Sequence, residues 1–175
     1  IGGVVVFHDI GDRIRAAEAL KEDAGQALFD LAKKDDPDLP TALKRITETC
    51  ASKLKVERVS IWLFTADRDE IVCENLFSLS GSRHEKGARL SAIRTPRYFK
   101  ALKESRLIDA NDAQNDPRTN EFAEDYLKPQ GISSMMDAPI RLHGEVVGVV
   151  CHEHVGDKRV WTLGEQIFAS SIADL

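Results

Sequence analysis

GISSMMDAPI, residues 131–140, is an apolar segment of strand length, and VVGVVCHEHVG, residues 146–156, is a second one. His143 and Gly144 lie between them and predict a tight turn, so the two segments together predict a β-hairpin. Thr162-Leu163-Gly164-Glu165 follows and has the capping-box pattern that begins a helix. A helix directly after a hairpin is expected to cover one of its faces.

The segments before the hairpin extend this pattern. Residues 58–64 and 70–79 predict two strands joined by a turn, and the first has apolar side chains on both of its faces. We expect a helix at residues 41–54, capped by Thr41, and another at residues 119–128. The order of elements predicts an α+β fold. An antiparallel sheet carries the first and last helices on one face, and loops and short helices cover a pocket on the other.

This arrangement resembles a GAF domain, the small-ligand sensing module of bacterial signalling proteins, over roughly Pro40 to Leu175. The resemblance implies a sheet with a ligand pocket under its loops. It also implies that the first and last helices connect the domain to its neighbours. The likeness is to GAF domains of multidomain sensors such as sensor histidine kinases.

Composition excludes several classes of function. The 175 residues include 42% hydrophobic and 30% charged residues, which suits one packed domain with an appendage. A net charge of −5 without a basic stretch argues against nucleic acid as a partner. No apolar run reaches the length of a membrane span, so we expect no membrane contact. Three widely spaced cysteines favour a reducing cytoplasm over a disulfide framework.

The N-terminal part predicts two further units. Residues 1–10 resemble the last strand of a PAS domain, and residues 11–36 predict a linker helix, which places the GAF domain at residues 37–175. Apolar side chains follow the linker helix at three- and four-residue steps, at Ala17, Leu20, Ala24, Ala27 and Leu31. This stripe is either a dimer seam or the face of a solvated connector. Because both ends interrupt regular structure, we expect the chain to be an excerpt of a longer signalling protein.

The acidic loop at residues 109–118 is the first candidate binding site. Asp109, Asp112, Asp116 and Arg118 could hold a small polar ligand, with Arg118 gripping a carboxylate or phosphate. The alternative is structural, because Asp and Asn also form turns and cap helices through their own side chains. The GAF resemblance implies that this loop lies over the pocket.

The strands supply the other candidates. Trp62, Met135 and Cys151 are candidates to line the pocket. His152 and His154 alternate on one face of a strand and could approach a metal, although a site needs at least a third ligand. Cys151-His152 is a dipeptide of the kind that holds a bilin in some GAF domains, but here it lies in the last strand. Haem, bilin and metal are therefore not expected, and the cofactor stays unknown.

The sequence thus predicts a cytoplasmic sensory GAF domain that binds an unidentified small molecule or a partner. We expect a homodimer through the terminal helices and an output domain further along the same chain. The output is a histidine kinase or, alternatively, a diguanylate cyclase or phosphodiesterase. Two other functions stay open, which are a ligand-free dimerisation spacer and an enzyme that reduces free methionine sulfoxide. The enzyme would need two cysteines close together at an open cavity.

Overall fold

A computed structural model describes residues 38–175, so the predicted PAS-like strand and linker helix lie outside the described residues. The α-helices of the described part are α2 Leu39–Leu54, α3 Pro96–Glu104 and α4 Leu163–Ala173. The strands are β1 Arg58–Phe64, β2 Glu70–Ser78, β3 Arg83–Glu85, β4 Arg89–Ser91, β5 Ile108–Ala110, β6 Ile132–Leu142 and β7 Glu145–Val155. A 3₁₀ turn, Asn120–Phe122, runs into a short π-helix, Ala123–Leu127. We call these two together the short helical segment.

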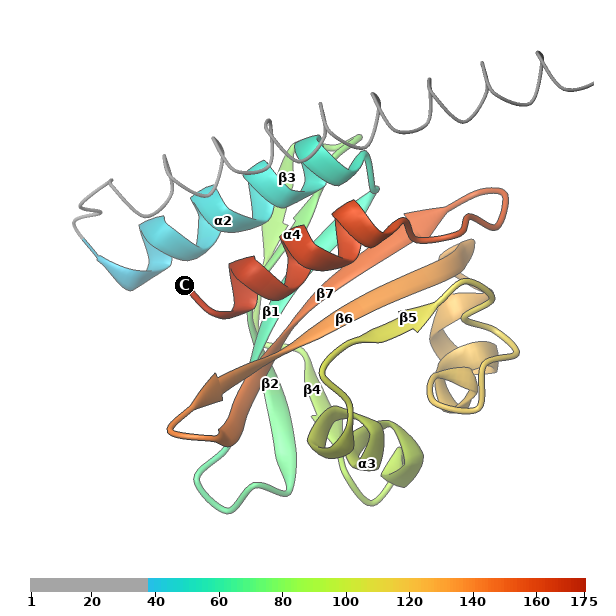
Figure 1. Ribbon diagram of the computed structural model, residues 1–175. Helices are drawn as coiled ribbons and strands as arrows, with labels where there is room; N and C mark the ends of the chain where they lie inside the picture. The colour runs from blue at the N-terminus through green and yellow to red at the C-terminus, as the bar shows by residue number, and fades with distance from the viewer. Residues whose placement is uncertain (1–37) are drawn as a thin grey trace, which may run out of the picture.

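The strands form one antiparallel sheet in the order β3-β2-β1-β7-β6-β5, with β4 paired to β2 (Figure 1). The predicted hairpin is confirmed as β6 and β7, which pair along most of their length. Its turn residues His143 and Gly144 have φ angles of 51° and 86°. Positive φ at both turn positions matches the right-handed twist of the flanking strands. The central position of β1, between β2 and β7, makes it the strand that joins the two hairpins.

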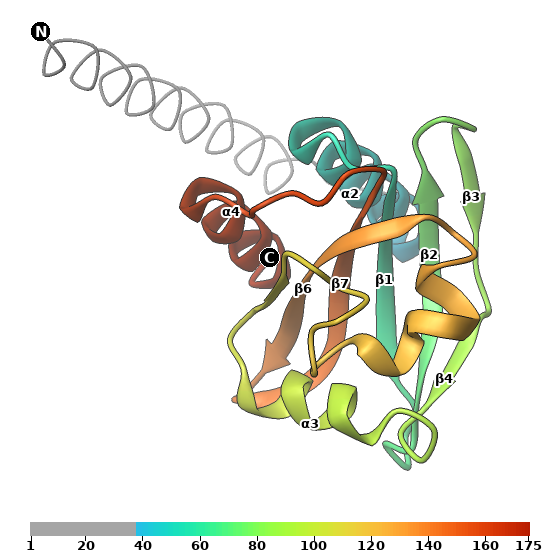
Figure 2. The same ribbon diagram turned by 90° about the vertical axis from the view of Figure 1, so that its right-hand side faces the viewer.

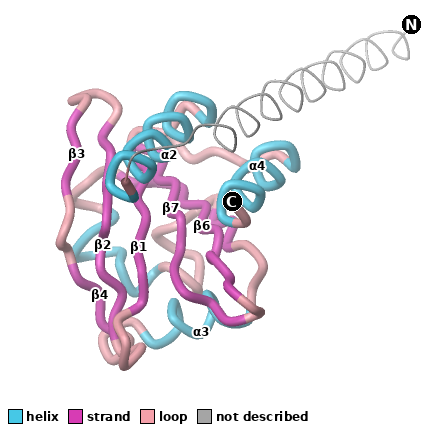
Figure 3. The backbone as a smooth tube through the Cα atoms, turned by 90° about the vertical axis from the view of Figure 1, so that its left-hand side faces the viewer, coloured by secondary structure: helices cyan, strands magenta, loops and turns pink. Residues whose placement is uncertain are grey.

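Helical segments lie on both faces of the sheet (Figures 1, 2 and 3). Buried apolar side chains form one layer on each face. On one face α2 and α4 lie side by side, and Cys50, Leu54 and Phe168 pack there with β1 side chains such as Val59. On the other face, side chains of α3 and the short helical segment, such as Tyr98 and Phe122, pack with sheet residues such as Met135 and Cys151. The predicted α+β fold, with first and last helices on one face, is confirmed. Strand β1 is apolar on both faces because each face is covered.

Helix α2 begins two residues earlier than predicted. Its N-cap is Asp38, whose Oδ1 accepts the backbone N–H of Thr41 at 2.8 Å, so Thr41 lies inside the first turn. Pro40 fits in that turn because the N–H that proline lacks would have no partner there. The prediction that Thr41 caps this helix was wrong. Asp38, three residues earlier, is also a residue type that caps helices, and it is the N-cap in the structure.

The segment predicted as a single helix, residues 119–128, is helical, but its turns are 3₁₀ and π in type. The 3₁₀ turn continues into a π-helical turn, in which the N–H of Lys128 donates to the carbonyl of Ala123, five residues back, at 3.0 Å. This wider turn carries Phe122 and Tyr126 toward the sheet, where both pack in the second apolar layer. Strand β5 includes Asp109, the first residue of the acidic loop.

The predicted capping box of α4 is confirmed. The N–H of Glu165 donates to the hydroxyl of Thr162, and Glu165 Oε2 accepts the N–H of Thr162 at 2.8 Å. Thr162→Ala is therefore expected to lower the free energy of unfolding by about 1 kcal/mol, because an alanine side chain accepts no hydrogen bond. Thr162→Ser keeps the hydroxyl and serves as the control. Urea unfolding of the three proteins measures the effect, and equal midpoints would contradict it.

Candidate functional site

A cavity of about 290 Å³ lies between the sheet and the elements that cover its second face. Its volume is at the small end of the range for small-molecule sites. Strands β1, β2, β6 and β7 form the floor, α3 and the short helical segment form the roof, and the segment that leads into β4 closes one side. The lining residues are Arg58, Trp62, Ile71, Leu76, Glu85, Ala88, Arg89, Leu90, Tyr98, Phe122, Tyr126, Met135, Cys151 and Glu153.

Most of the cavity wall is apolar. Trp62 and Met135 rise from the sheet, and Phe122 comes from the covering segment. The indole N–H of Trp62 donates to Ser60 Oγ at 2.8 Å, so its polar atom is satisfied within the protein. The ring is then free to present carbon to the cavity. An apolar wall of this kind favours ligands with a substantial apolar surface.

A buried ion pair occupies one end of the cavity. Arg58 Nε donates to Glu153 Oε2 at 3.0 Å, and these two side chains are only 16% and 4% exposed. The hydroxyl of Tyr126 donates to Glu153 as well, at 2.8 Å, and accepts from Arg58 Nη2 at 3.3 Å. Burial raises the pKa of Glu153, although Arg58 and Tyr126 oppose that rise. Burial and the nearby Glu153 charge also raise the pKa of Tyr126, which therefore keeps its proton.

A second polar cluster lies beneath the cavity on α3, β6 and β7. Cross-strand neighbours Asp137 and Cys151 meet Tyr98, whose hydroxyl donates to Asp137 Oδ2 at 2.6 Å and lies 3.6 Å from Cys151 Sγ. Burial raises the pKa of Asp137 to about 7, although the Tyr98 hydrogen bond opposes the rise. The other carboxyl oxygen, Oδ1, has no hydrogen-bond partner within the described residues. This carboxyl group therefore changes protonation near neutral pH.

The candidate residues from the sequence separate into two groups. Trp62, Met135 and Cys151 line the cavity. The four polar residues of the acidic loop are not among the lining residues. Arg118 lies instead between two carboxylates of its own loop, with Nη2 2.7 Å from Asp116 Oδ2 and Nη1 3.3 Å from Asp109 Oδ1. The Arg118 hydrogen bonds lower the pKa of Asp116, so this pair stays ionised near neutral pH.

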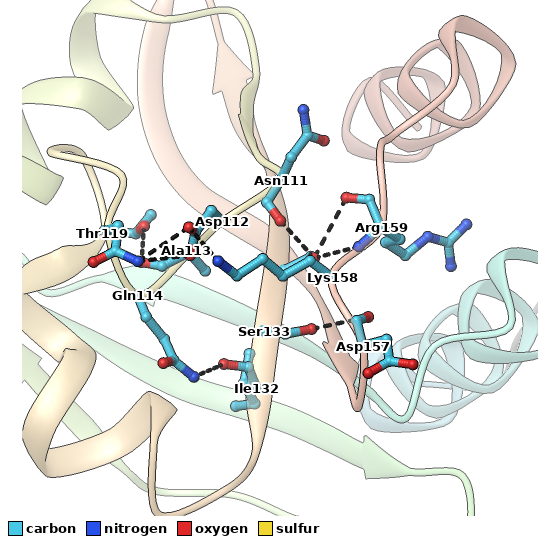
Figure 4. Close-up of polar contacts among 12 residues, drawn as sticks. Asn111, Asp112, Ala113, Gln114, Thr119, Ile132, Ser133, Asp157, Lys158 and Arg159 are labelled. Atoms are coloured by element: carbon cyan, nitrogen blue, oxygen red, sulfur yellow. Dashed lines mark hydrogen bonds and ion pairs between the residues drawn. The ribbon is translucent and has the colours of Figure 1, made fainter.

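The acidic loop contacts the connection between β7 and α4 (Figure 4). Lys158 Nζ donates to Asp112 Oδ2 at 2.6 Å, and Asn111 Oδ1 accepts the backbone N–H of Trp161 at 2.9 Å. Between them, Ser134 Oγ bonds to the carbonyl of Asn111 at 2.8 Å and accepts the N–H of Arg159 at 3.0 Å. The loop thus joins β6 to the segment that leads into α4, which gives these polar residues a structural role in this conformation.

The two histidines lie toward the helix face of β7. His152 is buried, and its Nδ1 bonds to the carbonyl of Met136 at 2.8 Å. Burial lowers the pKa of His152 to about 4, so the ring is neutral near pH 7. Within residues 38–175 the structure brings together no group of three histidine, cysteine or acidic side chains that could hold a metal. Cys151 faces the cavity and His152 faces the helices, so the dipeptide does not present both side chains to one ligand.

Sequence reasoning missed Arg58, Tyr98, Tyr126, Asp137 and Glu153 as site residues. Asp137 and Glu153 carried a usable signal, because an ionisable residue inside an otherwise apolar strand is buried only with partners. Arg58 stands at the start of a strand and looks like an ordinary surface residue in the sequence. The two tyrosines carry no local signal of a site, since spacing alone does not reveal a hydroxyl partner.

Comparison with known proteins agrees with this geometry. A family model described as "GAF domain" matches residues 38–175. The structure resembles the GAF domain of a phosphoenolpyruvate-protein phosphotransferase from Coxiella burnetii, with a TM-score of 0.68, 18% identity and 90% coverage of both chains. It also resembles the chromophore-binding domain of a bacteriophytochrome from Stigmatella aurantiaca, with a TM-score of 0.65 and 14% identity, covering 91% of this chain and 58% of that one.

A third similar structure is the blue-light absorbing form of the PixJ GAF domain from Thermosynechococcus elongatus. Its TM-score is 0.62 at 14% identity, over 77% of this chain and 79% of that one. These identities are low, so the three structures show a shared fold. No curated protein matches the chain. No helix within residues 38–175 has the length and apolar character needed to cross a membrane.

Proposed function

Because this chain belongs to the GAF domain family, we propose that it is a sensory module whose cavity binds a small molecule. The observation that carries the proposal is the cavity itself, which has an apolar wall between two buried polar clusters. A module that serves only as a spacer needs no such space, because close packing of its interior would be more stable. The similarity to sensory GAF domains supports the same conclusion.

The fold offers a direct route from the cavity to the terminal helices. Strand β7 places Cys151 and Glu153 at the cavity and then leads to Arg159. Arg159 Nη1 donates to the carbonyl of Leu54 at the end of α2 at 2.9 Å, and its Nη2 pairs with Glu165 at the start of α4. One side chain therefore contacts both helices. A ligand that favours one position of β7 would shift the population of helix arrangements by its differential affinity.

We further propose that α2 and α4 pass this shift to an output domain of the same polypeptide, such as a histidine kinase, within a homodimer. Leu163 and Ile167 on α4 are 73% and 49% exposed and lie four residues apart on one side of the helix. Exposed leucine and isoleucine at helical spacing are suited to contact a second copy. In this arrangement the terminal helices carry both the dimer contact and the signal.

The structure supports the methionine sulfoxide reductase alternative less well. Such an enzyme would need two cysteines at one open cavity. Cys151 is the one cysteine of the three that lines the cavity, while Cys50 lies on α2, in the apolar layer on the opposite face of the sheet. Burial raises the pKa of Cys50 and Cys151 above the ordinary thiol value, which disfavours the thiolate that attacks a substrate.

Native mass spectrometry of the protein purified from its own cells, followed by thermal melting with a small-molecule extract, tests the proposal. Ligand at about 100 times its Kd would stabilise the fold by about 2.7 kcal/mol, or roughly 5–10 °C. Leu90→Trp, which places an indole ring at the cavity wall, is expected to abolish the shift. Leu142→Trp makes the same change at an exposed hairpin position and is expected to keep it. No retained mass and no shift for the wild type would favour the spacer.

A further inference from the structure

We propose that the cavity selects an uncharged, largely apolar molecule that carries a hydrogen-bond donor, and that it rejects anions. This inference rests on the proposed function, since it names the class of ligand that the same cavity binds. It follows from the charges, the hydrogen positions and the apolar wall around the cavity.

The two cations of the cavity lining already have carboxylate partners. Arg58 is paired with buried Glu153, as described above. Arg89, at the outer edge, donates through Nε to Glu70 Oε2 at 2.8 Å. The adjoining groove outside Arg89 is lined by the acids Glu70, Glu121 and Asp125, against the two guanidinium groups of Arg89 and Arg94. One of these acids, Glu121, is itself paired with Arg97, whose Nε lies 3.2 Å from Glu121 Oε1. An anionic ligand would therefore meet no uncompensated cation in the cavity lining.

The helix end nearest the cavity is occupied as well. The first turn of α3 has free backbone N–H groups, which would attract an anion. Glu121 fills this position, because its Oε2 accepts the N–H of Tyr98 at 2.9 Å and its Oε1 accepts the N–H of Arg97 at 3.2 Å. The side chain of Glu121 is 9% exposed. A ligand phosphate or carboxylate would have to displace this buried carboxylate.

The tyrosine hydroxyls at the cavity act as acceptors toward a ligand. A hydroxyl has one hydrogen and two lone pairs. Tyr98 donates its hydrogen to Asp137, and Tyr126 donates its hydrogen to Glu153. Each tyrosine oxygen therefore has only a lone pair left for a ligand. The carboxylate oxygens of Glu153, beside Tyr126, are further acceptors. A ligand N–H or O–H group complements these atoms, whereas a ligand with acceptors alone would leave them desolvated and unpaired.

The remaining lining fits a compact ring system. Trp62, Phe122 and Met135 supply aromatic and thioether surface, which packs well against a flat apolar molecule. The cavity volume of about 290 Å³ suits a bicyclic ligand better than an extended one. Indole has this size and a single N–H donor, so it is a suitable probe of the proposed selectivity.

Two matched pairs of probes test the proposal by calorimetric titration of the protein. Benzofuran has the shape of indole without the N–H group, and indole-3-acetate has the shape of indole-3-acetamide with a negative charge. We expect indole to bind at least tenfold more tightly than benzofuran, and the amide at least tenfold more tightly than the acetate. Equal affinities within either pair, or tighter binding of the acetate, would overturn the proposal.

A variant of the buried lining carboxylate locates the source of the charge selectivity. Glu153→Gln leaves Arg58 without its carboxylate partner, so the preference for the amide over the acetate is expected to fall at least tenfold. Glu145→Gln makes the same change on the same strand at an exposed position that does not line the cavity, and the preference is expected to change less than twofold. Identical preferences in wild type and Glu153→Gln would count against the proposed mechanism of rejection.

The outcome separates this inference from the proposed function. A protein that retains a molecule from cell extract but prefers indole-3-acetate keeps the sensory function and loses the proposed selectivity. A protein that retains nothing from extract and binds none of the four probes loses both. Binding of indole and the amide with the expected preferences supports both.

Discussion

Gly148→Ala is expected to destabilise the protein by about 3 kcal/mol, at the upper end of what overpacking of a well-filled site costs. Gly148 lies in β7 opposite Leu63 of β1. A Cβ atom placed on it would lie 2.3 Å from the backbone carbonyl oxygen of Trp62 and 2.8 Å from Leu63 Cδ2. The backbone atom cannot rotate away as a side chain could, so β1 and β7 would have to separate. Chemical denaturation monitored by Trp fluorescence measures the loss.

Gly81→Ala is the matched control for this prediction. The nearest atom to its added Cβ is Arg83 Cβ at 3.8 Å, which is an ordinary contact. We expect its unfolding free energy to stay within about 0.5 kcal/mol of the wild type, as for surface substitutions generally. A Gly148→Ala protein as stable as Gly81→Ala would show that the two strands have more room than the structure gives them.

The free energy of unfolding of Asp137→Asn, relative to that of the wild type, is expected to increase as the pH rises. The folded-state pKa of Asp137, about 7, lies above its ordinary value of 3.8, so between these values the folded protein keeps a proton that the unfolded chain releases. The contribution of Asp137 to stability is therefore present below about pH 4, falls as the pH rises toward 7, and then levels off. The advantage of the asparagine variant should grow by about 3 kcal/mol between pH 5 and pH 8.

Chemical denaturation of the wild type and Asp137→Asn across this pH range measures the difference in unfolding free energy. His152 contributes to the pH dependence of both proteins equally, so its effect cancels in the difference. The His152 contribution has the opposite sign, because its lowered pKa costs stability as the pH falls. Tyr98→Phe provides a second check. It removes the hydrogen bond that favours the ionised Asp137 carboxylate, so the loss of stability with rising pH should continue to a higher pH than in the wild type. A pH-independent difference between wild type and Asp137→Asn would contradict the assignment.

Much of the fold could be predicted because its strongest signals are local. The apolar strands on either side of His143-Gly144 predict the hairpin. Thr162 and Glu165 predict the start of α4. The start of α2 was predicted less accurately. Asp38 and Thr41 are both suitable N-cap residues, and which of them caps the helix depends on where the chain turns. The π-helical turn that ends at Leu127 was not predicted, because the spacing of apolar residues does not show which carbonyl each backbone N–H group donates to.

The candidate site was harder to predict, because its polar groups come together through strand register. Arg58 and Glu153 are 95 residues apart in the sequence, and Tyr98 and Asp137 are 39 apart. The local sequence marks Asp137 and Glu153 as ionisable residues in apolar strands, but it does not identify their partners. The acidic loop attracted attention because its composition is distinctive, whereas the structure gives Arg118 and Asp112 partners outside the cavity lining. Sequence reasoning did place Trp62, Met135 and Cys151 among the candidates that line the cavity.

The position of β1 beside β7 has a consequence for how the chain is made. Residues that pair in the finished sheet, such as Arg58 and Glu153, leave the ribosome on the order of 10 s apart at 5–20 residues per second. During that interval β1 can pair with β2 alone, and its other edge exposes unpaired backbone N–H and C=O groups. Nascent chains on neighbouring ribosomes present the same edge. Slower translation of residues 65–145 should therefore increase aggregation before β7 arrives, while leaving the stability of the completed domain unchanged.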